Sequence, residues 1–360
     1  MRTRNIIFII LICIEIGTLL FLAIKKSNHN LFGFIALGAT VILLITSFCL
    51  MLFPKREVIN PTGKYEYEVV DVTMIDESRV ETYVNSGEKR SLEVKFWYPK
   101  GELSPSSCPL VIFSHGSFGN VNNNETLMKE LASKGYIAAS IGYTYLASEV
   151  TINNRKIKMS SEFRKEVMKI SPEKNKEEAL NLYRKWMELT TKDACFVIDS
   201  ILLKNEDFYS LVDKTKICVM GHSFGGATSL ALGRIRSDLY CVVSLESPFM
   251  YDVKGVENGK FVFDKEVYPT RMLNVYSDSS YSNLSKWDQY SQNNKYLHLN
   301  DEKYQNVYFK GLGHMHLCDF QIVSPFLSWI LSGKDSSNTA KINLELINKT
   351  IFNYFDSINF

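Results

Sequence analysis

Neither sign of charge dominates this sequence of 360 residues: 41 lysines and arginines stand against 39 aspartates and glutamates, for a formal net charge of +2. A nucleic-acid partner would require concentrated positive charge, so the composition indicates none. Cysteine is also sparse. Two of the seven cysteines, Cys13 and Cys49, lie in long apolar runs, and the other five show no paired spacing. The sequence therefore predicts neither a disulfide framework nor a zinc site.

Hydrophobic residues are concentrated near the start of the chain. Residues 6–24 (IIFIILICIEIGTLLFLAI) and 31–53 (LFGFIALGATVILLITSFCLMLF) contain one charged residue between them, Glu15. At about 1.5 Å per helical residue, each run is long enough to cross a hydrocarbon layer of ~30 Å. Because the linker of residues 25–30 is too short to be a domain, residues 1–56 are expected to form a membrane anchor of two transmembrane helices. A cleaved signal peptide and a pair of buried soluble helices are the alternatives.

Flanking charge predicts how this anchor is oriented. The positive residues beside the two runs are Arg2, Arg4, Lys55 and Arg56 on one side, and Lys25 and Lys26 on the other. Since positive charge is enriched on the cytoplasmic side of membrane proteins, both chain ends and the large domain of residues 57–360 are expected in the cytoplasm.

Strand-like and helix-like segments alternate through most of residues 57–360. Strands are expected over residues 65–74, 91–98, 110–113, 137–141, 216–220, 241–245, 272–276 and 306–309, and helices over residues 125–134, 177–204, 227–236 and 320–331. The short apolar runs are typical of strands covered on both faces. This alternation predicts an α/β fold with a mostly parallel sheet and helices on both faces.

Residues 143–176 do not fit the alternation. The segment lies between an expected strand and a long helix and is rich in lysine and arginine. It is interpreted either as a solvated excursion or as an insertion that caps the active site and contacts anionic lipid headgroups.

A candidate nucleophile lies in residues 221–225 (GHSFG), which fit the pattern G-x-S-x-G. The pattern follows an apolar strand and precedes a helix, the context of the nucleophile elbow of α/β-hydrolases. Gly221, Gly225 and Gly226 supply the room that such a turn needs. Ser223 is therefore predicted to be a nucleophile, which requires a base nearby. A glycine-rich loop with no catalytic role is the alternative.

The base is expected among six histidines. His314 and His316 lie in a glycine-punctuated loop (YFKGLGHMHLCDF) between the last expected strand and the final helix, where an α/β-hydrolase carries its histidine. His314 directly follows Gly-Leu-Gly, which lets the backbone bend toward the sheet, so it is favoured over His316. His222 lies inside the elbow and is expected to point away from the hydroxyl of Ser223.

Two residues are candidates for the acid that orients this histidine. Glu246 ends the strand after the elbow helix, in CVVSLESPFM, and Asp278 follows the next strand, in MLNVYSDSS. Many α/β-hydrolases take the acid from a few residues past the later strand, which here falls nearer Ser280 than Asp278. Glu246 is preferred and Asp278 is kept as the alternative.

Two backbone N–H groups are expected to form an oxyanion hole. One belongs to Phe224, the residue after the nucleophile. The other is expected in the loop of VIFSHGSFGN, where His115 and Gly116 open a tight turn and Ser117 is best placed to donate.

Four stretches, PLVIFSHGSFG, ICVMGHSFGGATS, VVSLESPFM and KGLGHMHLCDF, resemble in order and spacing the platelet-activating-factor acetylhydrolase family of α/β-hydrolases. The resemblance covers about residues 65–331 and extends more loosely to dienelactone-hydrolase-like and polyester-hydrolase-like enzymes. It implies an acid from the strand after the elbow, in a Leu-acid context matching Leu245 and Glu246. The family usually has aspartate there, so the longer Glu246 is expected to sit slightly differently. Phospholipids with short or oxidised acyl chains and other small esters are implied as the substrate class.

The sequence thus predicts a membrane-anchored serine hydrolase that cleaves carboxylic esters through an acyl-enzyme, with a small ester or lipid as substrate and no metal or organic cofactor. A serine peptidase or an acyltransferase with the same triad is one alternative. A non-catalytic protein of the same fold that binds a partner at the membrane is the other.

Overall fold

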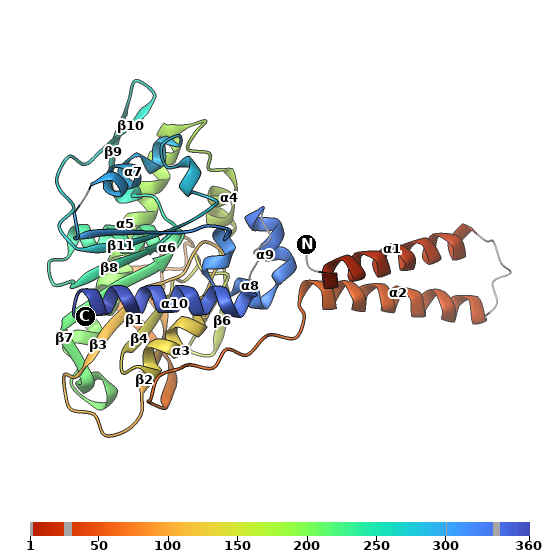
Figure 1. The fold of residues 1–360 in the computed structure, drawn as a ribbon, viewed down its shortest axis with the longest axis horizontal. Coiled ribbons are helices and arrows are strands. Elements are labelled where there is room, and N and C mark those ends of the chain that lie inside the picture. Colours follow the sequence, from red (N-terminus) through yellow and green to blue (C-terminus); the bar gives the residue numbers. More distant parts are fainter. Residues whose placement is uncertain (1–2, 25–30, 300, 334–338) are drawn as a thin grey trace.

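In the computed structural model, residues 3–24, 31–299, 301–333 and 339–360 are described. Within them, one large mixed sheet forms the centre of the main domain, and a helical hairpin projects from that domain (Figure 1). The sheet has eight strands in the order β1-β2-β4-β3-β7-β8-β11-β12. Their bounds are β1 Tyr67–Val80, β2 Lys89–Pro99, β3 Cys108–Ser114, β4 Ile137–Gly142, β7 Val212–His222, β8 Cys241–Leu245, β11 Met272–Ser277 and β12 Tyr304–Phe309. β1, β2 and β4 pair antiparallel, and every later pair is parallel.

Helices cover both faces of this sheet. α5 (Lys176–Leu203) and α6 (Phe224–Ile235) pack on one face, and α3 (Glu125–Ser133) and α10 (Ala340–Ser357) on the other. Alternate residues of β3 show the division: Leu110 and Ile112 belong to the first core, Val111 and Phe113 to the second. Strands buried on both faces must be apolar throughout, which is why they appear in the sequence as short continuous runs. The predicted α/β architecture with a mostly parallel sheet is confirmed.

The first two helices, α1 (Thr3–Ile24) and α2 (Leu31–Leu52), lie side by side and away from the sheet (Figure 1). Their charged residue Glu15 accepts a hydrogen bond from Ser47 of the other helix at 3.0 Å. Among the described residues, one helix is long and apolar enough to cross a membrane, through residues 35–52, while residues 6–21 form a shorter apolar helix. One of the two predicted spans therefore meets this criterion.

The segment of residues 143–176 lies outside the eight-stranded sheet. It contains a two-stranded ribbon, β5 (Glu149–Ile152) with β6 (Arg155–Lys158), and the helix α4 (Ser161–Lys169). Phe163 is fully buried and meets the ring of Phe224 edge-on at 5.6 Å. One face of α4 is thus packed beside the residue that follows Ser223, although most of its other residues are exposed or half-buried. The domain also contains a second ribbon, β9 (Val253–Glu257) with β10 (Lys260–Phe263), and the short helix α7 (Ser291–His298).

The single helix expected over residues 320–331 is wrong. The structure has two short helices there, α8 (Phe320–Val323) and α9 (Pro325–Ser332). Pro325 disfavours helical backbone at the residue before it, so Ser324 leaves the helix and its side chain caps the backbone N–H of Leu327. The same Ser324 hydroxyl donates to the backbone oxygen of Leu52, at the end of α2. The break therefore provides a contact between the hairpin and the domain.

Candidate active site

Ser223 lies on a strained turn between β7 and α6. Its backbone angles are φ 54° and ψ −121°, a conformation that costs free energy in residues other than glycine. Nearby glycines make the turn possible: a Cβ on Gly221 would lie 2.2 Å from the oxygen of Gly225, and one on Gly225 would lie 2.0 Å from the oxygen of Ser114. The strand, the turn and the helix therefore pack as in a nucleophile elbow, with Ser223 at its tip.

The loop after β12 brings His314 to the candidate acid. His314 Nδ1 lies 2.9 Å from Glu246 Oε2, and the backbone N–H of His314 donates to Ser279 Oγ at 2.9 Å. His316 is buried, and its Nδ1 accepts the backbone N–H of Gly313 at 2.8 Å. Of the two histidines favoured by the sequence, His314 is the one hydrogen-bonded to Glu246.

Glu246 is buried directly after β8 and receives several hydrogen bonds. Ser277 donates its backbone N–H at 3.0 Å and its hydroxyl at 2.7 Å, Ser280 donates its backbone N–H at 3.1 Å and its hydroxyl at close range, and His314 donates through Nδ1. Burial alone would raise the pKa of Glu246, but the hydrogen bonds from His314, Ser280 and Ser277 outweigh it and lower the pKa to about 2. The carboxylate is therefore ionised at neutral pH and can stabilise a positive imidazolium.

The alternative acid, Asp278, is engaged elsewhere. Its carboxylate accepts a short hydrogen bond from the hydroxyl of Tyr308 and one from the backbone N–H of Gly311 at 3.2 Å. Since Nδ1 of His314 carries one proton and directs it to Glu246, the geometry favours Glu246 as the orienting group.

A cavity of about 300 Å³ joins these side chains. Ser117, Ser223, Phe224, Glu246 and His314 all line it. The loop after β3 approaches the nucleophile closely, because a Cβ on Gly116 would lie 3.3 Å from the Cβ of Ser223. The predicted nucleophile, base, acid and both predicted oxyanion donors thus share one cavity.

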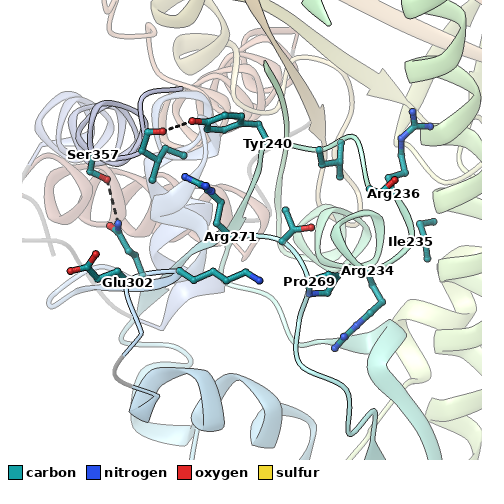
Figure 2. A pocket seen from close by; sticks show the side chains of 14 residues that line it. Arg234, Ile235, Arg236, Tyr240, Pro269, Arg271, Glu302 and Ser357 are labelled. Carbon is teal, nitrogen blue, oxygen red and sulfur yellow. Dashed lines mark hydrogen bonds between the residues drawn. The ribbon is translucent and has the colours of Figure 1, made fainter. Parts of the chain in front are cut away.

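A larger hollow of about 830 Å³, drawn in Figure 2, lies at the amino ends of β8 and β11. Tyr240 and Arg271, which line it, precede β8 and β11, whereas Ser223 follows the carboxyl end of β7. Arg271 lies over the ring of Tyr240, and the described residues around this hollow include no histidine. The described residues that line this hollow thus include no counterpart of the His314–Glu246 pair.

Sequence reasoning missed four side chains that support the site. Ser277 and Ser280 bind Glu246, Ser279 accepts the backbone N–H of His314, and His222 contacts His314 by hydrogen bond and ring packing. A signal existed for the serines, because residues 277–280 (SDSS) begin at the last residue of β11, near the place where the alternative acid Asp278 was expected. Nothing in the local pattern indicated the partner of His222.

Comparison with known proteins decides the family. The family model described as platelet-activating factor acetylhydrolase, isoform II, matches residues 97–357, a stretch that includes Ser223, Glu246 and His314. The chain belongs to this family. The platelet-activating factor acetylhydrolase of Cavia porcellus is 26% identical over 258 residues, which is 67% of this chain and 55% of that protein. The chain therefore spans about half the length of this curated relative.

Two solved structures resemble this member of the platelet-activating factor acetylhydrolase family. Ferulic acid esterase from Streptomyces cinnamoneus superposes with a TM-score of 0.61 at 19% identity, covering 84% of this chain and 92% of that chain. A dienelactone hydrolase-like promiscuous phosphotriesterase from metagenomic libraries has a TM-score of 0.49 at 14% identity, covering 81% and 98%. The likeness to the esterase confirms the predicted α/β-hydrolase fold, and the family predicted from four short stretches is also confirmed.

Proposed function

We propose that this protein is a serine hydrolase that cleaves carboxylic esters through an acyl-enzyme. One observation carries the proposal: His314, oriented by the ionised Glu246, lines the same cavity as the strained Ser223. The curated relative is named as an acetylhydrolase and the solved relative as an esterase, which supports the same class of reaction.

The proposed reaction uses side chains and backbone groups of this chain alone. Ser223 Oγ attacks the acyl carbon while His314 Nε2 takes its proton, and Glu246 stabilises the imidazolium. The N–H groups of Phe224 and Ser117 stabilise the oxyanion. His314 then protonates the leaving alcohol as the ester bond breaks, which leaves an acyl group on Ser223. A water molecule that loses its proton to His314 releases the acid and restores the serine.

The cavity favours a small, uncharged ester. Its walls are largely apolar and come from the segment of residues 143–176, from α5 and from the loop after β8. The apolar residues are Val167, Ile170, Pro172, Tyr183, Trp186 and Met250. The described residues that line it include no lysine or arginine. With a volume of about 300 Å³, it lies at the small end of ligand pockets.

A panel of esters tests this function. The purified protein is expected to hydrolyse 4-nitrophenyl acetate and butyrate faster than the dodecanoate, because the longer chain exceeds the cavity. Matched 4-nitroanilides and added alcohol acceptors separate ester hydrolysis from a peptidase and from an acyltransferase. The proposal fails if no ester is cleaved, which would favour the non-catalytic binding protein, or if the anilides are the better substrates.

We also propose that α1 and α2 together anchor the domain in a membrane, with residues 57–360 in the cytoplasm. Support comes from the apolar surface of both helices, where Ile14, Phe21, Ile42 and Ile45 are exposed, and from the pairing of Glu15 with Ser47, which lowers the cost of burying a charge in lipid. More positive residues flank the start of the first apolar run and the end of the second than lie in the linker between the runs, and this excess favours the cytoplasmic placement of the domain.

The full-length chain is accordingly expected to stay in the membrane pellet after an alkaline carbonate wash. Replacing both Ile42 and Ile45 by arginine adds an insertion cost of about 2.5–3.5 kcal/mol each and should move the chain to the supernatant. As a control, leucine at the same two positions should change nothing. Release of the unaltered chain by the wash would contradict the anchor, and digestion of the domain by protease outside intact cells would contradict the topology.

A further inference from the structure

His222, the last residue of β7, connects the nucleophile strand to the loop that carries the base. Its Nε2 lies 3.1 Å from the backbone oxygen of His314, 92 positions away in the sequence. A carbonyl oxygen only accepts hydrogen bonds, so Nε2 carries the proton and donates it. Burial, followed by the proximity of His314, lowers the pKa of His222 to about 3. The ring is therefore neutral at physiological pH and keeps this tautomer.

The ring of His222 also packs against the ring of His314. Their centroids are 4.6 Å apart and their planes are inclined by 33°. Nδ1 of His222 would lie 3.1 Å from a Cβ on Gly116, so the ring also contacts the loop after β3. His222 thus fills the space between the loop expected to bind the oxyanion and the loop that carries the base.

His314 is held through three of its polar groups. Its backbone N–H donates to Ser279, its Nδ1 donates to Glu246, and its backbone oxygen accepts from His222. The remaining polar atom is Nε2, the atom that must exchange a proton with Ser223. Because His222 and Ser223 are consecutive, the bond to the His314 backbone fixes the base relative to the nucleophile.

We propose that His222 is a positioning residue that sets the imidazole of His314 relative to Ser223. The proposal rests on the proposed ester hydrolysis and adds to it a role for the second residue of the elbow motif. His222 itself transfers no proton, because its ring is neutral and its one N–H is held in the hydrogen bond to the backbone oxygen of His314.

Two amide substitutions of His222 test this role. His222→Gln extends an amide N–H to about the place of Nε2, whereas the shorter His222→Asn places its amide near Nδ1 and does not reach the backbone of His314. A misplacement of about 1 Å costs on the order of 10² in rate, so His222→Asn is expected to lower kcat about 10- to 100-fold with KM changed less than about twofold. His222→Gln is expected to recover most of kcat. His298→Gln, at the exposed end of α7, is the control.

A proton NMR signal separates positioning from simple packing. The imidazole proton that His314 shares with Glu246 should give a downfield resonance, assigned by its loss in Glu246→Gln. We expect it in the unaltered protein and in His222→Gln, and expect exchange with water to broaden it in His222→Asn. Equal kcat in both amide variants, with the resonance intact, would overturn the proposal. If the unaltered protein cleaves no ester, the resonance still reports on positioning, so the two failures remain distinguishable.

Discussion

Replacing Ser223 by alanine is expected to lower kcat for 4-nitrophenyl acetate by about four to six orders of magnitude. Removing the nucleophile of a Ser-His-acid triad removes the acyl-enzyme route, and only binding and the oxyanion donors continue to act. The substitution removes only the hydroxyl of Ser223 and keeps its Cβ at the strained turn. The circular dichroism spectrum and the melting temperature should therefore stay close to those of the unaltered protein.

Ser237→Ala is the matched control for this substitution, because Ser237 is exposed at the opposite edge of the sheet. It should leave kcat unchanged. If Ser223→Ala retains activity that rises in proportion to enzyme concentration, the nucleophile lies elsewhere. The melting temperature is measured on the same sample, because a loss of activity caused by unfolding would say nothing about the nucleophile.

Replacing Glu246 by glutamine is expected to lower kcat by a factor of about 10³ to 10⁴. The carboxylate holds His314 through Nδ1, and its pKa of about 2 keeps it ionised throughout the working range. An amide of the same shape cannot stabilise the imidazolium and can orient the ring in the wrong tautomer, which costs about 10⁴ in the serine proteases. The measurement is kcat between pH 6 and pH 9, and the deficit should persist across this range.

Asp278→Asn is the control that separates the two candidate acids. Its carboxylate bonds Tyr308 and Gly311, so its loss is expected to change kcat by less than about threefold. A larger loss in Asp278→Asn than in Glu246→Gln would assign the acid to the later strand and contradict the proposed triad.

Much of this fold could be predicted because the local pattern and the tertiary structure demand the same residues. Strands buried on both faces must be apolar, so β3, β4, β7, β8 and β11 were evident as short runs. The elbow was evident because its turn excludes side chains at Gly221 and Gly225. Ser223, Glu246 and His314 could be predicted as a set because each follows a strand, and they occur along the chain in the order nucleophile, acid and histidine.

The supports of the site could not be predicted, because they depend on contacts between distant segments. Position 280, near the place where many α/β-hydrolases carry a later-strand acid, holds a serine that donates to Glu246. Glu246 itself has φ 57° and lies within hydrogen-bond distance of the hydroxyls of Ser277 and Ser280. The packing of α4 could not be predicted either, because Phe163 is the one buried residue of this helix and the residues around it are polar.

The proposed hydrolysis requires that His314 activate Ser223, and covalent labelling of the serine measures that activation. A fluorophosphonate reacts with an activated serine, and mass spectrometry of the digested protein identifies the residue that carries the adduct. We expect rapid labelling at Ser223 in the unaltered protein and labelling slower by at least about 10³-fold in His314→Gln. An adduct on another residue, or equal rates in the two proteins, would contradict it.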